Sequence, residues 1–107
     1  MMSTKVNEIL SKGKSLSSIG VENWALTKSA SLNALSMFLE LEIPVLGGDV
    51  CEINDGEISY NYDNWYCERE IGESAVDFIL RSNQKAREYI EAYSVKDDSV
   101  LFAFVLG

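Results

Sequence analysis

The sequence contains no histidine and only two cysteines, and each shortage excludes a kind of protein. Without histidine there is no Ser-His-Asp or Cys-His nucleophile pair, no His-containing zinc site and no imidazole acid/base chemistry. The two cysteines, Cys51 and Cys67, are too few for an all-cysteine zinc site or for the disulfide framework of a small secreted protein. We therefore expect buried, reduced thiols and no cofactor.

Basic residues are also scarce. The chain has 9 Lys and Arg against 17 Asp and Glu, which gives a net charge of −8. This balance argues against nucleic-acid binding, because no excess of cations exists to release counterions from phosphates, and any charged partner is expected to be basic. No run approaches the roughly 20 apolar residues that span a bilayer, and the N-terminus has no apolar core of signal-peptide length. A cytoplasmic protein without membrane association is predicted.

The length of 107 residues and the hydrophobic content of 47% are those of one compact globular domain. We expect residues 1–107 to form a single domain. Within it, residues 1–19 are expected to supply a short lead helix and a serine-rich connector, and residues 20–107 the core. The lead helix is predicted over residues 4–12, where Val6, Ile9 and Leu10 recur at helical spacing.

Two longer helices are predicted from apolar residues at helical spacing. The first begins near Asn23, with Asn23 or Thr27 as N-cap, and is stopped by Pro44, which lacks an amide donor. The second opens on Ser74, which has Asp77 three residues later as in a capping box, and continues for about five turns. Its basic residues Arg81, Lys85 and Arg87 are expected to be solvated beside acidic neighbours.

Three strands complete the expected fold. Residues 45–53 predict a strand with a bulge or tight bend at Gly47-Gly48, and Asp55-Gly56 favours a type I′ hairpin turn. Residues 57–62 alternate so that Ile58, Tyr60 and Tyr62 share one face, residues 63–72 are expected to form a loop, and residues 100–106 are apolar throughout, as in a strand covered on both faces. The predicted class is α+β, with a small, mostly antiparallel sheet of about three strands packed against two long helices.

Acidic residues gather in the middle of the chain together with aromatic rings. Residues 21–70 carry ten acids and two bases, a net charge of −8. Tyrosine and tryptophan beside carboxylates are typical of a surface that recognises a basic protein. Burial tendencies favour the core for Trp24 and Tyr60, whereas Trp65 and Tyr66 suit either role. The candidate partner-binding residues are Asp49, Glu52, Asp55, Glu57, Tyr62, Asp63, Trp65, Tyr66 and Glu68.

Two alternatives remain open on the residues alone. A small carboxylate-dependent enzyme would use Asp49 beside Glu52 or Asp63 as a general acid/base pair. A scaffold subunit would self-associate through an exposed sheet edge or through the apolar C-terminal strand. Gly47, Gly48 and Asp49 do not form a phosphate-binding loop, since the Lys-Ser/Thr pair of such a loop is missing, and a role in backbone geometry is expected for the glycines.

Several short blocks, in order, resemble the immunity protein 40 family. They are residues 20–28 (GVENWALTK), 43–50 (IPVLGGDV), 62–66 (YDNWY), and 81–82 (RS) ahead of 86–90 (AREYI), and the resemblance covers the chain from about Gly20 to its C-terminus. The family consists of predicted antidotes of bacterial polymorphic toxin systems. The resemblance implies a non-enzymatic, cytosolic protein that binds a cognate toxin domain and blocks its active site or substrate access. An acidic, aromatic hairpin suits capture of a basic enzyme, for instance a nuclease.

Overall fold

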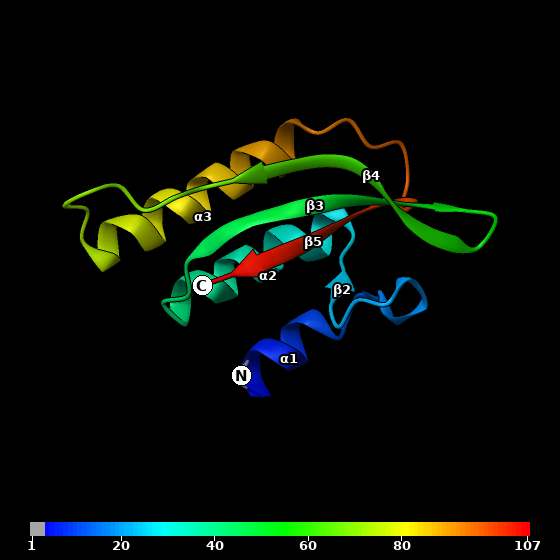
Figure 1. The fold of residues 1–107 in the computed structure, drawn as a ribbon, viewed down its shortest axis with the longest axis horizontal. Coiled ribbons are helices and arrows are strands. Elements are labelled where there is room, and N and C mark those ends of the chain that lie inside the picture. The colour runs from blue at the N-terminus through cyan, green and yellow to red at the C-terminus, as the bar shows by residue number, and fades with distance from the viewer. Residues whose placement is uncertain (1–3) are drawn as a thin grey trace.

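The computed structural model describes residues 4–107. Strands β3 (Val45–Asn54), β4 (Glu57–Tyr66) and β5 (Val100–Leu106) form an antiparallel sheet in the order β4-β3-β5. Helices α2 (Lys28–Glu40) and α3 (Ala75–Ala92) pack on it, and Figure 1 shows the two helices running along the sheet. The predicted α+β class is confirmed.

The main core fills the space between this sheet and the helices. Phe38 of α2 and Ile90 of α3 are fully buried against Val50 of β3 and Phe102 of β5. The lead helix is confirmed as α1 (Thr4–Leu10), whose Val6, Ile9 and Leu10 join the same cluster. Polar side chains lock α3 in place, because the Ser82 hydroxyl accepts from the Val45 amide at 3.1 Å.

The segment expected to be a simple connector is more ordered than predicted. It contains β1 (Lys14–Ser15), which pairs with β2 (Trp24–Ala25), and the 3₁₀ turn η1 (Ser17–Ile19). Leu16 is 0% exposed in a second cluster, beside Cys51 and Ala103 on the sheet. Leu16 therefore anchors this polar segment by packing into an apolar cluster that also contains Ile58 and Leu101 of the sheet.

The ends of the long helices follow from local hydrogen bonds. Thr27, rather than Asn23, is the N-cap of α2, and its hydroxyl accepts from the Ala30 amide; Ser74 caps α3 in the same way. Helix α2 ends at Glu40, ahead of Pro44, where the Ile43 amide donates to the Phe38 carbonyl oxygen and the Glu42 amide to that of Leu39. These two bonds are a Schellman motif, with Glu42 in the left-handed position at φ 57°.

Strand β4 is longer than the sequence predicted and is interrupted by a bulge. Residues 64–66, expected in a loop, pair with β3. Between the pairs Asp49–Asn64 and Cys51–Tyr60, β4 has three residues where β3 has one. The prediction that Tyr62 shares a face with Ile58 and Tyr60 is wrong, because the bulge places Tyr62 at φ 72° and leaves it 86% exposed, whereas Ile58 is buried.

The predicted hairpin turn and glycine irregularity are confirmed. Asp55 and Gly56 have φ of 52° and 79°, as a type I′ turn requires, and join β3 to β4. The register of β3 against β5 shifts between Val45 and Gly47. Gly48 lies under Trp65, and a Cβ at this position would collide with the indole ring.

Candidate functional site

The nine candidate residues fall into three groups along the hairpin of β3 and β4. Glu52, Asp55 and Glu57 lie near its turn; Asp49, Tyr62 and Asp63 lie at the bulge; Trp65, Tyr66 and Glu68 lie at the far end. Glu57 and Tyr66 are separated by nine residue steps, or about 30 Å of extended strand. The candidate set is thus spread over both strands of the hairpin, its turn and the residues just after it, and is not a single cluster; Figure 1 shows the length of this hairpin.

The bulge is held by a hydrogen-bonded clip from the C-terminus of α3. The Tyr93 hydroxyl donates to the Asp63 carboxylate at 2.6 Å and accepts from the Asn61 amide at 2.9 Å. The Asn61 side-chain oxygen also accepts from the Asp63 backbone amide at 2.9 Å. These bonds fix the residues on both sides of Tyr62, so that its ring is displayed to solvent from a defined backbone.

Burial keeps the phenols and the thiol around this clip neutral. The pKa of Tyr93 is raised by burial and by its hydrogen bond to Asp63, and that of Tyr89 by burial and by the Asp63 charge. Burial, followed by the charge of Asp49, raises the pKa of the Cys51 thiol to about 11. Both cysteines are free and buried, as predicted, and Cys51 is therefore an unreactive core residue.

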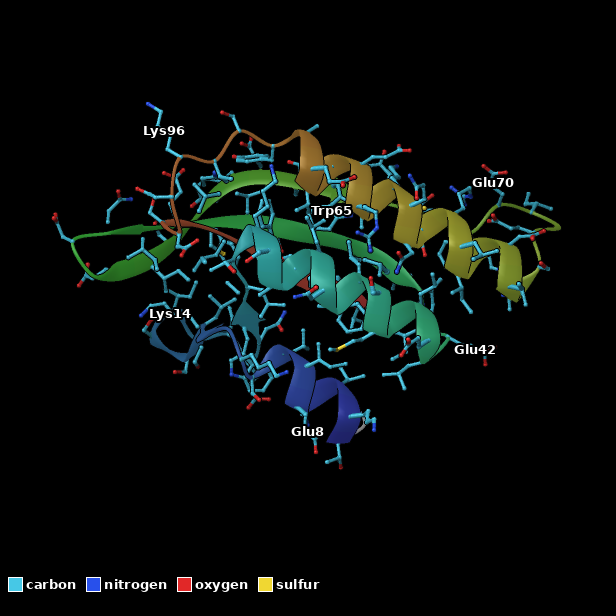
Figure 2. All side chains as sticks on the ribbon, turned by 180° about the vertical axis from the view of Figure 1, so that it is seen from behind. Glu8, Lys14, Glu42, Trp65, Glu70 and Lys96 are labelled. Carbon is cyan, nitrogen blue, oxygen red and sulfur yellow. The ribbon has the colours of Figure 1, made fainter. Side chains whose placement is uncertain are left out.

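At the far end the two adjacent aromatic residues point in opposite directions. Trp65 is only 6% exposed and stacks on Tyr89 with 4.9 Å between ring centroids, and Figure 2 shows it between the sheet and the helices. Its ring belongs to the core and is not presented to a partner. Tyr66 is 68% exposed, with the Lys85 ammonium 5.2 Å from its ring centroid. Of the pair, Tyr66 is the surface residue.

The loop that follows β4 is held by Arg81, which the sequence predicted to be a solvated residue. Its guanidinium donates to both carboxylate oxygens of Glu73, at 2.7 and 2.8 Å, and to the Glu68 carbonyl oxygen at 2.6 Å. The prediction is wrong because Arg81 pairs with Glu73, which lies eight residues earlier. Pairing rules for helices concern residues three or four apart, so they do not predict this contact. Arg87 is likewise engaged, since it donates to the Ser36 hydroxyl at 3.1 Å.

Other features bear on the chemistry that the domain can perform. Over residues 4–107, no group of three or more His, Cys, Asp and Glu side chains is placed to hold a metal ion. An open hollow of about 720 Å³ lies beside η1 and β2 and is lined by Asn7, Ser15, Ser17, Gly20, Val21, Glu22, Asn23 and Trp24. Among the described helices, none is long and apolar enough to cross a membrane.

These features define a class of protein: a small α+β domain that presents carboxylates and tyrosine rings along one edge strand. A model of the immunity protein 40 family matches residues 15–106, and the chain belongs to that family. Membership implies toxin neutralisation with a cognate toxin as partner, and proteins of this kind are generally inhibitors rather than enzymes. No curated protein and no solved structure matches the chain.

Proposed function

We propose that this immunity protein neutralises its toxin by binding a basic domain of it along the exposed side of β4. The observation that carries the proposal is the bulge at Tyr62. A bulky residue at positive φ is an outlier that the surroundings must hold in place, and such strain is concentrated at functional positions. Here the clip from Tyr93 holds the two residues beside Tyr62, whose ring is 86% exposed.

Charge supports a basic partner. Residues 45–70 contain seven acids and one base, and Asp55, Glu57, Asp63 and Glu68 are all exposed. A nuclease fits best, because its surface is built to hold phosphates and is therefore positive where inhibition is most effective. The site of action on this account is the bacterial cytoplasm, where the toxin would meet its substrate.

In this mechanism the carboxylates and the tyrosine rings have different roles. Exposed carboxylates accelerate association by attracting the basic surface, and Tyr62 and Tyr66 slow dissociation as rigid anchors. A standard interface buries about 800 Å² on each partner, a patch roughly 30 Å across. This matches the span of β4, so the bound domain would block the toxin's active site or its access to substrate without chemistry on either protein.

Growth rescue tests the proposal. We would co-express the toxin domain with the wild-type protein or with the Glu52→Lys/Glu57→Lys variant, and score growth and co-purification together. Asp63 is left unchanged because its carboxylate holds the bulge. We expect the wild-type protein to rescue growth and form a complex, and the variant to bind at least about tenfold more weakly, since two attractive charges become repulsive.

The matched control is Glu8→Lys/Glu40→Lys, which makes the same change in net charge at exposed positions on α1 and α2. We expect this control to rescue growth like the wild-type protein. Equal binding by the hairpin variant and the wild-type protein would refute the surface proposed here. If the folded wild-type protein neither rescues growth nor binds the toxin domain, the proposal that it neutralises this toxin is wrong.

A further inference from the structure

The loop of residues 67–74, between β4 and α3, is braced by hydrogen bonds and carries an exposed apolar side chain, Ile71. Arg81 ties both of its ends together through Glu68 and Glu73, and a further N–H of its guanidinium donates to the Cys67 sulfur at 3.2 Å. Within the loop, the Glu70 amide donates to the Glu73 carboxylate and the Glu73 amide returns a bond to the Glu70 carbonyl oxygen, both at 3.0 Å. The loop is therefore braced both at its ends and across its middle.

The charges that close the loop persist over a wide pH range. The pKa of Glu73 is lowered to about 2, chiefly by the hydrogen bonds from Arg81 and then by the Glu70 amide. The same pairing raises the pKa of Arg81. Both groups are consequently ionised at neutral pH, and the bidentate pair sets the geometry of the loop.

Ile71 has no packing role in the domain itself. Its exposed fraction is 107%, so the side chain stands clear of the rest of the protein, and Gly72 beside it takes the positive φ of 81° that turns the chain back. Exposed carboxylates flank it at Glu68 and Glu70, the latter with 74% of its side chain exposed, and Figure 2 shows Glu70 at the outside of the loop. An apolar tip on a pre-ordered loop loses little entropy when it is bound.

We infer that Ile71 is a second contact with the toxin and inserts into an apolar pocket bordered by basic residues. This inference rests on the proposed function. Tyr66 and Ile71 are five residue steps apart along the chain, so the two lie within about 18 Å of each other and fit one interface of standard size. The carboxylates of Glu68 and Glu70 would meet the basic rim while the isoleucine fills the pocket, and Arg81 acts as the positioning residue.

The test measures the affinity of the purified full chain for the toxin domain. Ile71→Ala should weaken binding about tenfold and Ile71→Asp about thirtyfold or more, because a buried apolar anchor is lost or replaced by a charge. The control Val76→Asp changes another exposed apolar residue, 62% exposed in the first turn of α3, and should alter affinity less than about twofold. Thermal unfolding of the Ile71 variants should match that of the wild-type protein.

A double-mutant cycle separates positioning from a general effect on folding. Arg81→Gln should weaken binding about fivefold, and when combined with Ile71→Ala it should add almost nothing, because Arg81 acts through Ile71. Full additivity would show that Arg81 has only a structural role. If Ile71→Asp binds like the wild-type protein while Glu52→Lys/Glu57→Lys does not, this inference is wrong and the proposed function stands. A wild-type protein that does not bind overturns both.

Discussion

At the scale of single residues, the backbone is most unusual at Glu42 and Tyr62. Both have positive φ, at 57° and 72°, a region in which side chains larger than glycine cost about 1–2 kcal/mol. Glu42 completes the Schellman motif that ends α2, where glycine is the preferred residue and a negative charge opposes the helix dipole. Tyr62 is fixed by the clip at the bulge. Neither side chain is buried, so neither is retained for core packing.

These two positions allow a matched comparison. Glu42→Gly and Tyr62→Gly should each raise the free energy of unfolding by about 0.5–1 kcal/mol, because the relief of strain exceeds the added entropy of the unfolded chain. Only Tyr62→Gly should weaken toxin binding, by about tenfold or more, since an exposed anchor is lost. Urea denaturation and titration calorimetry measure the two quantities. A Tyr62→Gly variant that gains stability and keeps full affinity would contradict the role assigned to this ring.

The residue types predicted the N-cap of α3 and the hairpin turn more successfully than they predicted the contacts of the surface side chains. The Ser74 cap and the Asp55-Gly56 turn depend on local hydrogen bonds and on permitted φ values. Both can be inferred directly from the residue types at these positions. The roles of Tyr93 and Arg81 depend on partners 30 and 8 residues away, so no local pattern contains them. Trp65 was equally consistent with core and contact because its neighbours are polar, and only its stacking on Tyr89 settles its place.

At the scale of elements, the sheet depends on the close contact between Gly48 and Trp65. Their residues are paired across β3 and β4, and the indole ring covers the glycine. A Cβ at Gly48 would also lie 2.7 Å from the Ala103 carbonyl oxygen on β5. The glycine therefore lets three strands and one large ring meet at a single point.

Gly48→Ala should lower the free energy of unfolding by about 2–3 kcal/mol, because neither the buried ring nor the neighbouring backbone can move away cheaply. Adding Trp65→Phe should recover part of this loss, since a smaller ring makes room for the methyl group, and the double variant should lose less than the sum of the single changes. Ser59→Ala, exposed on β4, serves as the control. Urea denaturation followed by circular dichroism measures all four; an unchanged midpoint for Gly48→Ala would contradict this packing.

The existence of the longer elements was predictable from the sequence, and the end of β4 was not. The helices, β3 and β5 follow from apolar spacing that the core confirms. The second half of β4 begins with Asp63-Asn64 in the sequence, which is polar and typical of a loop. Residues 64–66 nevertheless pair with β3, because the bulge absorbs the extra residues before them. The hairpin of β1 and β2 was missed because each strand has only two residues.

At the scale of the whole molecule, charge and shape are distributed unevenly. The chain is drawn out to 46 Å along its longest axis, and the hairpin of β3 and β4 projects beyond the helices at one end (Figure 1). Most of the net charge of −8 belongs to this hairpin and the loop after it. A partner approaching from that side meets exposed carboxylates before it meets the tyrosine rings, and electrostatic attraction should therefore govern the rate of association.

The most direct measurement of the central claim is the association rate of the purified protein with its toxin domain as salt is varied. Between about 50 and 500 mM salt the rate should fall at least about tenfold, because screening shortens the range of the hairpin's charges. Glu52→Lys/Glu57→Lys should associate slowly at every salt concentration, and Glu8→Lys/Glu40→Lys should follow the wild-type curve. A salt-independent rate, identical for all three proteins, would contradict capture of a basic toxin along β4.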